Sequence, residues 1–327
     1  MIPSDFFHEC RIPGPYPTAR AAARLAAIVL AGALTGAENA SAQTPISMIP
    51  SDVRVYTAEK IITPLIIDGR PDEEVWSLVP WSESFIDIRG ANHPDQPHLR
   101  TRMKILWDTQ NLYVAAELEE PHLWATLTER DAIIYRDHDF EIFLDPDGDG
   151  EAYYEYEVNA LGTVFDLFLD RPYSQGGSAT IDWDIPMLQS AVHLRGTLND
   201  PSDMDEGWTI EVAIPWIDII PPNTWEGWRD VGMEPGPTIP NHIAGPHKPP
   251  RERIVPRHGD IWRMNFSRVH WPLEIVDGGY VKTEEWDFGE DHPEWNWVWS
   301  PQGEINMHLP SRWGAVRFRD GQAGGDR

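Results

Sequence analysis

Three aspartates stand at alternate positions in a short segment, and proteins use this spacing to bind calcium. They are Asp145, Asp147 and Asp149, followed by Gly150. Calcium prefers carboxylate and carbonyl oxygens, and D-x-D-x-D-G opens the helix–loop–helix calcium loop. The complete loop needs a Glu at its twelfth position, where this chain has Tyr156. We therefore expect no EF-hand. A structural calcium ion at these aspartates is one hypothesis, and a solvated acidic turn is the other.

Hydrolytic chemistry would need other patterns. Glycoside hydrolysis uses two carboxyl groups, about 5.5 Å apart in retaining enzymes and about 6.5–9.5 Å apart in inverting ones. The chain has 53 Asp and Glu residues, so pairs of acids in the sequence carry almost no information. It contains neither a Gly-x-Ser-x-Gly elbow nor a His-Glu-x-x-His helix. No catalytic residue is predicted.

Composition excludes several classes of protein. The 327 residues carry a formal net charge of −27, and such an acidic surface repels nucleic acid and anionic membranes. The single Cys cannot form a disulfide framework or a cysteine-based zinc site. An apolar content of 41% is enough for a packed core.

The first 42 residues are typical of a secretory signal peptide. Leu25 to Ala37 is an uncharged apolar run, preceded by Arg24 and followed by the small-x-small signal Ala40-Ser41-Ala42. The run is too short for a membrane anchor, which needs about 18 apolar residues or more. We expect residues 1–42 to be removed, with the mature protein secreted, periplasmic or in the cell envelope.

Alternation of apolar and polar residues predicts many short strands. It is clearest at 101–107 and 112–118, which form a hairpin, and at 140–144 and 153–159. Further strands are expected at 163–169, 189–194, 207–214, 261–269 and 313–319. Helical periodicity is nearly absent. This pattern favours an all-β, antiparallel sandwich.

One domain with long insertions accounts for the rest of the chain. Residues 43–60 are a lead-in, and 61–320 are expected to form a single sandwich. Segments 221–256, rich in Pro, and 271–302, rich in Trp and acids, interrupt the strand pattern. Long loops on a rigid sandwich often bind ligands. For 221–256, an ordered loop and a disordered insertion are both open.

A series of motifs resembles carbohydrate-binding module family 9. The opening Ile66–Trp76 resembles the family's IDG…W pattern, and Asp139–Asp145 resembles its D-x-E-I-F-x-D strand. Further resemblances follow in order at 154–159, 207–216, 262–266 and 308–318. The resemblance covers nearly all of the chain after the leader. It implies a DOMON-like β-sandwich of immunoglobulin or jelly-roll type that binds sugars, usually as a module of polysaccharide hydrolases.

The resemblance also implies a binding site. Family members hold a sugar between two aromatic rings, with polar side chains on neighbouring strands. By position, the first ring is Tyr135, the second falls on Met307, and Trp299 is an alternative ring from the nearby loop. The polar positions are Glu141, Glu157 and Asn159. Met307 and Glu157 depart from the family pattern, since Met offers no flat ring and Glu157 stands where a cationic donor is usual.

Thirteen of the sixteen Trp residues divide by position, and Trp81, Trp124 and Trp183 stay unassigned. Six lie in or beside predicted strands and are expected in the core: Trp76, Trp107, Trp208, Trp216, Trp262 and Trp313. Seven lie in irregular stretches and are candidate binding platforms: Trp225, Trp228, Trp271, Trp286, Trp295, Trp297 and Trp299. A flat ring covers the apolar face of a sugar.

The resulting expectation is a secreted, non-catalytic protein that binds poly- or oligosaccharides. It requires no cofactor, binds no nucleic acid and does not insert into a membrane. The oligomeric state stays open. Two alternatives remain, namely a glycan-active enzyme that cleaves O-glycosyl bonds on the same sandwich, and an envelope interaction protein that has lost the sugar site.

Overall fold

The described part of the chain is almost entirely β-structure. The computed structural model describes residues 53–219, 255–283 and 293–321, which all belong to one unit spanning Ser41–Arg327. Within them, the α-helix content is a single turn, α1 (Glu74–Ser77). No helix in these ranges has the length and hydrophobicity to cross a membrane. The predicted signal peptide lies outside the described residues, as does nearly all of the 221–256 insertion.

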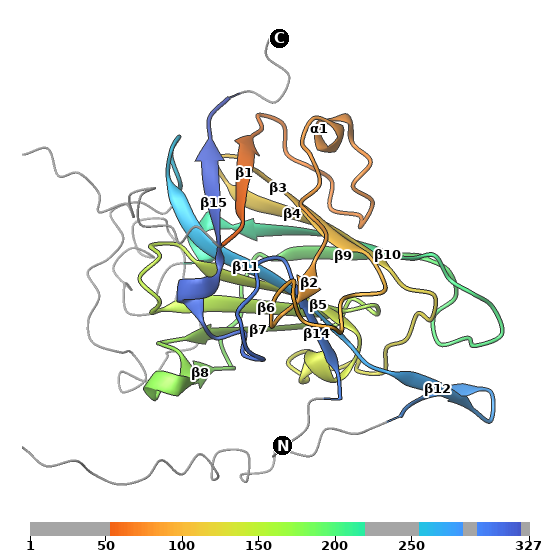
Figure 1. The fold of residues 1–327 in the computed structure, drawn as a ribbon. Helices are drawn as coiled ribbons and strands as arrows, with labels where there is room; N and C mark the ends of the chain where they lie inside the picture. The colour runs from red at the N-terminus through yellow and green to blue at the C-terminus, as the bar shows by residue number, and fades with distance from the viewer. Residues whose placement is uncertain (1–52, 220–254, 284–292, 322–327) are drawn as a thin grey trace, which may run out of the picture. The chain divides into compact units, whose positions relative to one another are not determined.

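The nine strands predicted from alternation are all present, and the all-β sandwich is confirmed (Figure 1). They are β3 (Thr101–Trp107), β4 (Asn111–Glu119), β5 (Asp139–Asp145), β6 (Tyr153–Asn159), β7 (Val164–Leu169), β9 (Gln189–Arg195), β10 (Gly207–Pro215), β11 (Ile261–His270) and β15 (Gly314–Arg319). Most neighbours pair antiparallel, as expected.

The centre of the sheet is parallel, which the sequence did not indicate. β1 (Val55–Lys60) pairs in parallel with β15 on one side and with β3 on the other. The strand order is β8-β7-β6-β5-β11-β15-β1-β3-β4-β10-β9, with β8 at Ala179–Thr180. The sheet therefore starts at Val55, inside the segment 43–60 that we expected to be a lead-in.

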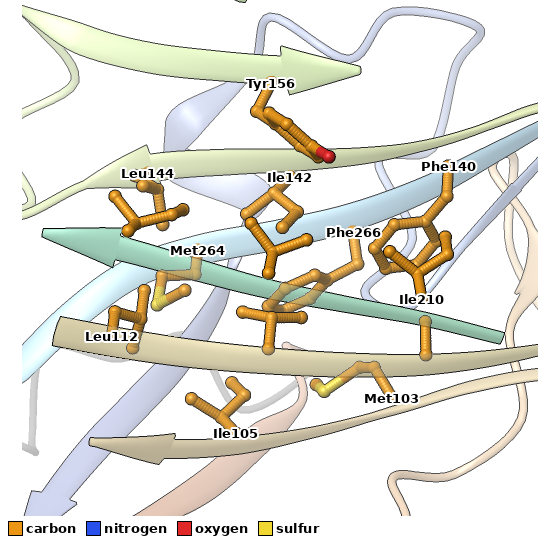
Figure 2. Packing of buried hydrophobic residues seen from close by; sticks show 14 of the residues in the cluster. Met103, Ile105, Leu112, Phe140, Ile142, Leu144, Tyr156, Ile210, Met264 and Phe266 are labelled. Carbon is orange, nitrogen blue, oxygen red and sulfur yellow. The ribbon is translucent and has the colours of Figure 1, made fainter. Parts of the chain in front are cut away.

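The two ends of this long sheet fold over each other and enclose the core. Figure 2 shows Met103, Ile105 and Ile210 of one half facing Ile142 and Phe266 of the other. All five are buried completely. Because strand side chains alternate between faces, each inward residue leaves its neighbours on the opposite face. On β5 and β6 those neighbours are mostly acids.

The segment 271–302 contains strands that alternation did not reveal. β12 (Leu273–Val276) and β13 (Gly279–Lys282) form a separate hairpin. β14 (Trp295–Val298) pairs with β11 and with the short strand β2 (Ile86–Asp87). This pairing attaches the Trp-rich part of the segment to the main sheet.

Burial overturns part of the Trp assignment. Trp271, Trp297 and Trp299 are at most 1% exposed, so none is an accessible platform. The six Trp residues expected in the core are all buried, as predicted. Trp295 is half-buried against the core. Trp225, Trp228 and Trp286 lie outside the described residues.

Candidate functional site

A row of buried carboxyl groups lies on the face of β5 and β6 that is turned away from the main core. Glu141 and Glu157 stand directly opposite each other in the antiparallel register, and Asp139 lies opposite Asn159. Glu155 follows on the same face of β6. We call these four acids, Asp139, Glu141, Glu155 and Glu157, the carboxyl row. None is more than 7% exposed.

Burial and mutual repulsion favour the neutral form of these acids. Loss of hydration on burial raises the pKa of Glu141 to about 7. Burial, with the added charge of Glu141, raises the pKa of Glu155 to about 8. Burial and the charges of Glu141 and Glu155 also raise the pKa of Glu157 well above its ordinary value. Burial does the same to the pKa of Asp139, again with a contribution from Glu141. Four adjacent carboxylates cannot all ionise without a compensating cation or donor.

Tyr135 borders this row, as the resemblance implied. It lies in the 3-10 turn η3 (Ile134–Arg136), and its backbone N–H donates to Glu157 Oε2 at 3.0 Å. Its carbonyl accepts a hydrogen bond from Trp271 Nε1 at 2.8 Å. Burial, then the charge of Glu157, raises the pKa of the Tyr135 phenol to about 12. Backbone contacts thus hold the ring at the edge of the row.

A second tyrosine, Tyr173, lies at the same row and escaped the sequence analysis. It begins the 3-10 turn η4 (Tyr173–Gln175), is 48% exposed, and meets the His308 ring edge-on at 4.6 Å. Burial of the phenol raises its pKa, and the charges of Glu155 and Glu157 and the Tyr135 phenol add to this effect. The row therefore has one tyrosine held by Glu157 and another, more exposed, at the same carboxyl groups.

Asn159 lies beside the row, but its side-chain amide is hydrogen-bonded within the protein, in part to the loop that follows β6. Oδ1 accepts the backbone N–H groups of Leu161 and Thr163 at 3.0 and 3.1 Å. Nδ2 donates to the Leu127 carbonyl at 2.8 Å and to Asp137 Oδ2 at 2.9 Å. With these four bonds made, the side chain has no remaining donor, and it positions the loop after β6.

The two candidates for the second ring do not provide one. Trp299 is buried in the main core, 5.8 Å from the Phe266 ring, so its assignment as a sugar platform is wrong. Its ring lies against Gly314, where an added Cβ would be 2.2 Å from Trp299 Cζ3. Met307 packs against a second apolar cluster that includes Trp313, and its carbonyl accepts from Trp313 Nε1 at 2.7 Å.

The acidic turn after β5 brings its three aspartates together. Asp145 is buried, and its two oxygens accept from the N–H groups of Gly148 and Gly150 at 3.0 and 2.8 Å. Both glycines have left-handed φ angles of 70° and 83°, which favour glycine. Carboxylate oxygens of Asp145, Asp147 and Asp149 lie within 4.8 Å of one another. Burial, then the charge of Asp147, raises the pKa of Asp145 to about 7. Carboxylate oxygens are the hard donors that calcium prefers, and three aspartates can supply the negative charge that a Ca²⁺ ion requires.

Comparison with known proteins agrees with this architecture. Residues 67–235 match the family described as carbohydrate family 9 binding domain-like. A structure from Bacteroides uniformis, described as that of a proposed carbohydrate-binding protein, superposes with a TM-score of 0.50 at 14% identity, covering 82% of this chain and 100% of that one. A family 9 module from Caldicellulosiruptor kristjanssonii, solved with cellotriose, gives a TM-score of 0.46 at 16% identity, covering 83% of this chain and 98% of that one.

Two curated relatives are much longer proteins. Endo-1,4-beta-xylanase A of Thermoanaerobacterium saccharolyticum is 27% identical over 158 residues, which cover 48% of this chain and 11% of that enzyme. The enzyme of the same name from Thermotoga neapolitana is 28% identical over 183 residues, covering 54% and 14%. The chain thus matches only a small part of each xylanase. Because the family match extends over more than half of the chain, the protein belongs to the carbohydrate family 9 binding domain-like family.

Proposed function

We propose that the protein is a secreted, non-catalytic carbohydrate-binding protein whose binding site is the carboxyl row with Tyr135 and Tyr173. The observation that carries this proposal is the row of acids on β5 and β6, bordered by the phenol rings of Tyr135 and Tyr173. A sugar has apolar C–H faces that pack on aromatic rings and hydroxyls that donate to carboxylate oxygens. Glu141 Oε2 and Asp139 Oδ2 are buried and make no hydrogen bond within the described ranges, so the row has polar capacity that the protein's own contacts leave unused.

Family membership supports binding over catalysis. The part of each xylanase that this chain resembles is at most 14% of the enzyme's length. A glycan-active enzyme remains the second candidate because Glu141 and Glu155 have raised pKa values of about 7 and 8, as a general acid would need. Incubation with polysaccharides and measurement of new reducing ends separates the two, since a binding protein releases none.

Truncation of the two tyrosines tests the site. We expect Tyr135→Ala and Tyr173→Ala each to weaken binding of cello- or xylo-oligosaccharides about tenfold or more, because each removes a stacking surface. Tyr173→Phe keeps the ring and is expected to stay close to wild type. Trp81→Ala is the control, since the Trp81 ring is partly exposed but packs under Arg102, 4.5 Å away. Calorimetric titration across a panel of oligosaccharides measures all four variants. Equal affinity of wild type and both Ala variants would contradict the site.

We also propose that the turn with Asp145, Asp147 and Asp149 binds calcium. Calcium at a hundredfold excess over its Kd is expected to stabilise the fold by about 2.7 kcal/mol. Asp147→Asn should remove most of that gain because it deletes one charged ligand, whereas Asp203→Asn, an exposed position outside the turn, should keep it. Thermal unfolding with calcium and with EGTA makes the measurement. Identical midpoints for the wild type in both would rule the site out.

Export completes the proposal. The apolar run Leu25–Ala37 and the signal Ala40-Ser41-Ala42 motivate it. Expression in a bacterial host followed by mass spectrometry of the exported protein should give a mature N-terminus at Gln43. Full-length protein retained in the cytoplasm would count against export.

A further inference from the structure

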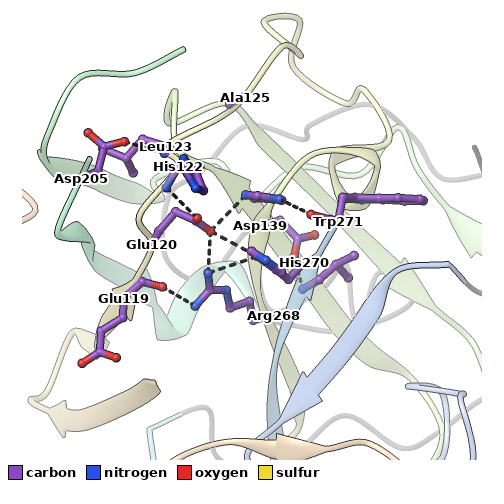
Figure 3. Close-up of polar contacts among 12 residues, drawn as sticks. Glu119, Glu120, His122, Leu123, Ala125, Asp139, Asp205, Arg268, His270 and Trp271 are labelled. Carbon is purple, nitrogen blue, oxygen red and sulfur yellow. Dashed lines mark hydrogen bonds and ion pairs between the residues drawn. The ribbon is translucent and has the colours of Figure 1, made fainter. Parts of the chain in front are cut away.

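We propose that Glu120, His138 and His270 form a binding site for a divalent transition metal ion, with Zn²⁺ as the best fit. Glu120 directly follows β4, His138 directly precedes β5, and His270 is the last residue of β11. The three side chains, with Arg268, form one buried polar cluster (Figure 3). Glu120 and His138 are each 2% exposed and His270 is 6% exposed.

The donor atoms have the spacing that a metal ion requires. Glu120 Oε2 lies 3.1 Å from His138 Nδ1 and 3.2 Å from His270 Nδ1. All three atoms lie within 4.8 Å of one another. In a tetrahedral zinc site, with bonds of about 2.0–2.1 Å, two ligand atoms are about 3.3 Å apart. Three protein ligands leave one position for water or another small ligand.

The tautomer of His138 directs a lone pair toward Glu120. His138 Nε2 lies 3.0 Å from the carbonyl oxygen of Trp271, and a carbonyl only accepts, so Nε2 carries the proton. In a neutral imidazole, Nδ1 is then an acceptor. This buried atom has no hydrogen bond, although the Glu120 oxygen is close. Two acceptors cannot face each other at this distance, so either a second proton on His138 or a bound metal ion must join them.

His270 presents the same problem from the other side. Its Nδ1 lies 3.4 Å from the Arg268 guanidinium, which can only donate. A neutral His270 then has its proton on Nε2 and one lone pair on Nδ1, 3.2 Å from Glu120 Oε2, and a metal ion bound there would replace the long contact with Arg268. The ring is held firmly, because it stacks on His138 at 4.3 Å and on Trp297 at 5.0 Å. The His138 and His270 rings are 27° from parallel, so coordination of one ion by both Nδ1 atoms requires a rotation of at least one ring.

The groups around the three ligands match those that support known metal sites. Metal-binding histidines commonly donate their second ring N–H to a backbone carbonyl, as His138 does to Trp271. The second oxygen of Glu120 accepts the backbone N–H of His122 at 3.0 Å. Arg268 donates to Glu120 Oε2 at 2.7 Å. A carboxylate oxygen has a further lone pair for a metal.

The donor set selects the kind of metal. Imidazole nitrogen suits Zn²⁺ and its first-row neighbours, whereas Ca²⁺ takes oxygen ligands. This cluster therefore differs in chemistry from the three aspartates after β5. A bound ion would join the ends of β4 and β11 to the start of β5. It would also fix the segment that carries Tyr135, because Trp271 contacts both His138 and the Tyr135 carbonyl.

The test is metal binding by the full chain, purified with a tag that contains no histidine. The probes are ZnCl₂, CoCl₂ and CaCl₂, each added alone to chelator-treated protein. We expect one Zn²⁺ per chain, and Co²⁺ bound with the visible bands of low coordination number. His138→Gln and His270→Gln should each weaken Zn²⁺ binding at least a hundredfold. His193→Gln, which changes a histidine on β9, and Asp147→Asn should leave it unchanged.

A readout on wild-type protein keeps the test independent of folding in the variants. Long-range ¹H–¹⁵N spectra of the imidazoles should show that Zn²⁺ shifts Nδ1 of two histidines, with the proton retained on Nε2 of His138. Absence of stoichiometric Zn²⁺ binding at micromolar concentration would overturn the site. So would Zn²⁺ binding that His138→Gln and His270→Gln leave intact, or shifts confined to other histidines. The cluster would then be a proton-shared network around Glu120.

Discussion

Replacement of Glu211 by Ala is expected to destabilise the fold by about 3–5 kcal/mol. Glu211 lies on β10, has no exposed surface, and accepts three hydrogen bonds. Its donors are the backbone N–H groups of Asp68 and Gly69, at 3.2 and 3.0 Å, and Trp76 Nε1 at 2.9 Å. Removal of the carboxylate leaves Trp76 Nε1 and the Gly69 N–H buried without an acceptor, and the Asp68 N–H partly buried; each buried loss costs about 1–3 kcal/mol.

Two further variants separate this explanation from general damage to the sheet. Glu211→Gln keeps one acceptor oxygen and should lose less stability than the Ala variant. Glu206→Ala removes an acid whose side chain is 82% exposed and should change the free energy of unfolding by less than about 0.5 kcal/mol. Urea unfolding at pH 7 measures all three. A Glu211→Ala protein within about 1 kcal/mol of wild type would show that the segment 66–76 is held by other contacts.

Stability should fall as pH rises from 5 to 8, by at least about 3 kcal/mol. Buried acids cause this slope. Burial raises the folded-state pKa of Glu155 to about 8 and those of Glu141 and Asp145 to about 7. Their unfolded values lie near 4, so between these limits the folded chain binds more protons than the unfolded chain. Under that condition the free energy of unfolding decreases as pH rises. The contribution of these acids to stability is complete only below their unfolded-state pKa values.

A neutral isostere at one position should reduce the slope. Glu155→Gln removes the acid whose pKa is highest among these three. The variant should therefore be more stable than wild type at pH 8 and nearly equal to it at pH 5. Glu274→Gln, an exposed acid on β12, is the matched control and should leave the profile unchanged. Urea unfolding midpoints at half-unit pH steps provide the profile. A wild-type profile that is flat or that rises toward pH 8 would mean that the carboxyl row ionises without cost.

The alternation of apolar and polar residues was sufficient to predict most strands. Its period of two is a local property of the chain and does not depend on which strands pair. Met103 and Ile105 face the core for that reason. Tyr135, Glu141 and Glu157 could be brought together because the resemblance gives Tyr135 as a binding ring and assigns Glu141 and Glu157 to neighbouring strands. The structure confirms that Glu141 and Glu157 are opposite each other and that the Tyr135 backbone contacts Glu157.

The failures share a physical origin in contacts between distant residues. Trp299 has polar and acidic neighbours in sequence, yet pairing of β14 with β11 buries it. Tyr173 is a single aromatic residue after a proline, with no periodicity, and only its proximity to the acids of β6 marks it. His138 and His270 are far apart in sequence, without ligand spacing, so only the pairing of β5 with β11 reveals their relation.

The parallel pairing of β1 with β15 has a consequence for the order of folding. β15 borders β11 and β1 borders β3, so within the described residues the pairing of β1 with β15 joins the two halves along the main strand order of the sheet. This pairing cannot form until synthesis has passed Arg319. Before that, the edges of β3 and β11 lack these neighbours and can pair with other chains. Contacts between the two ends of a chain also slow folding. Loss of either strand should therefore interrupt the sheet at its centre and leave aggregation-prone edges, instead of merely trimming the fold.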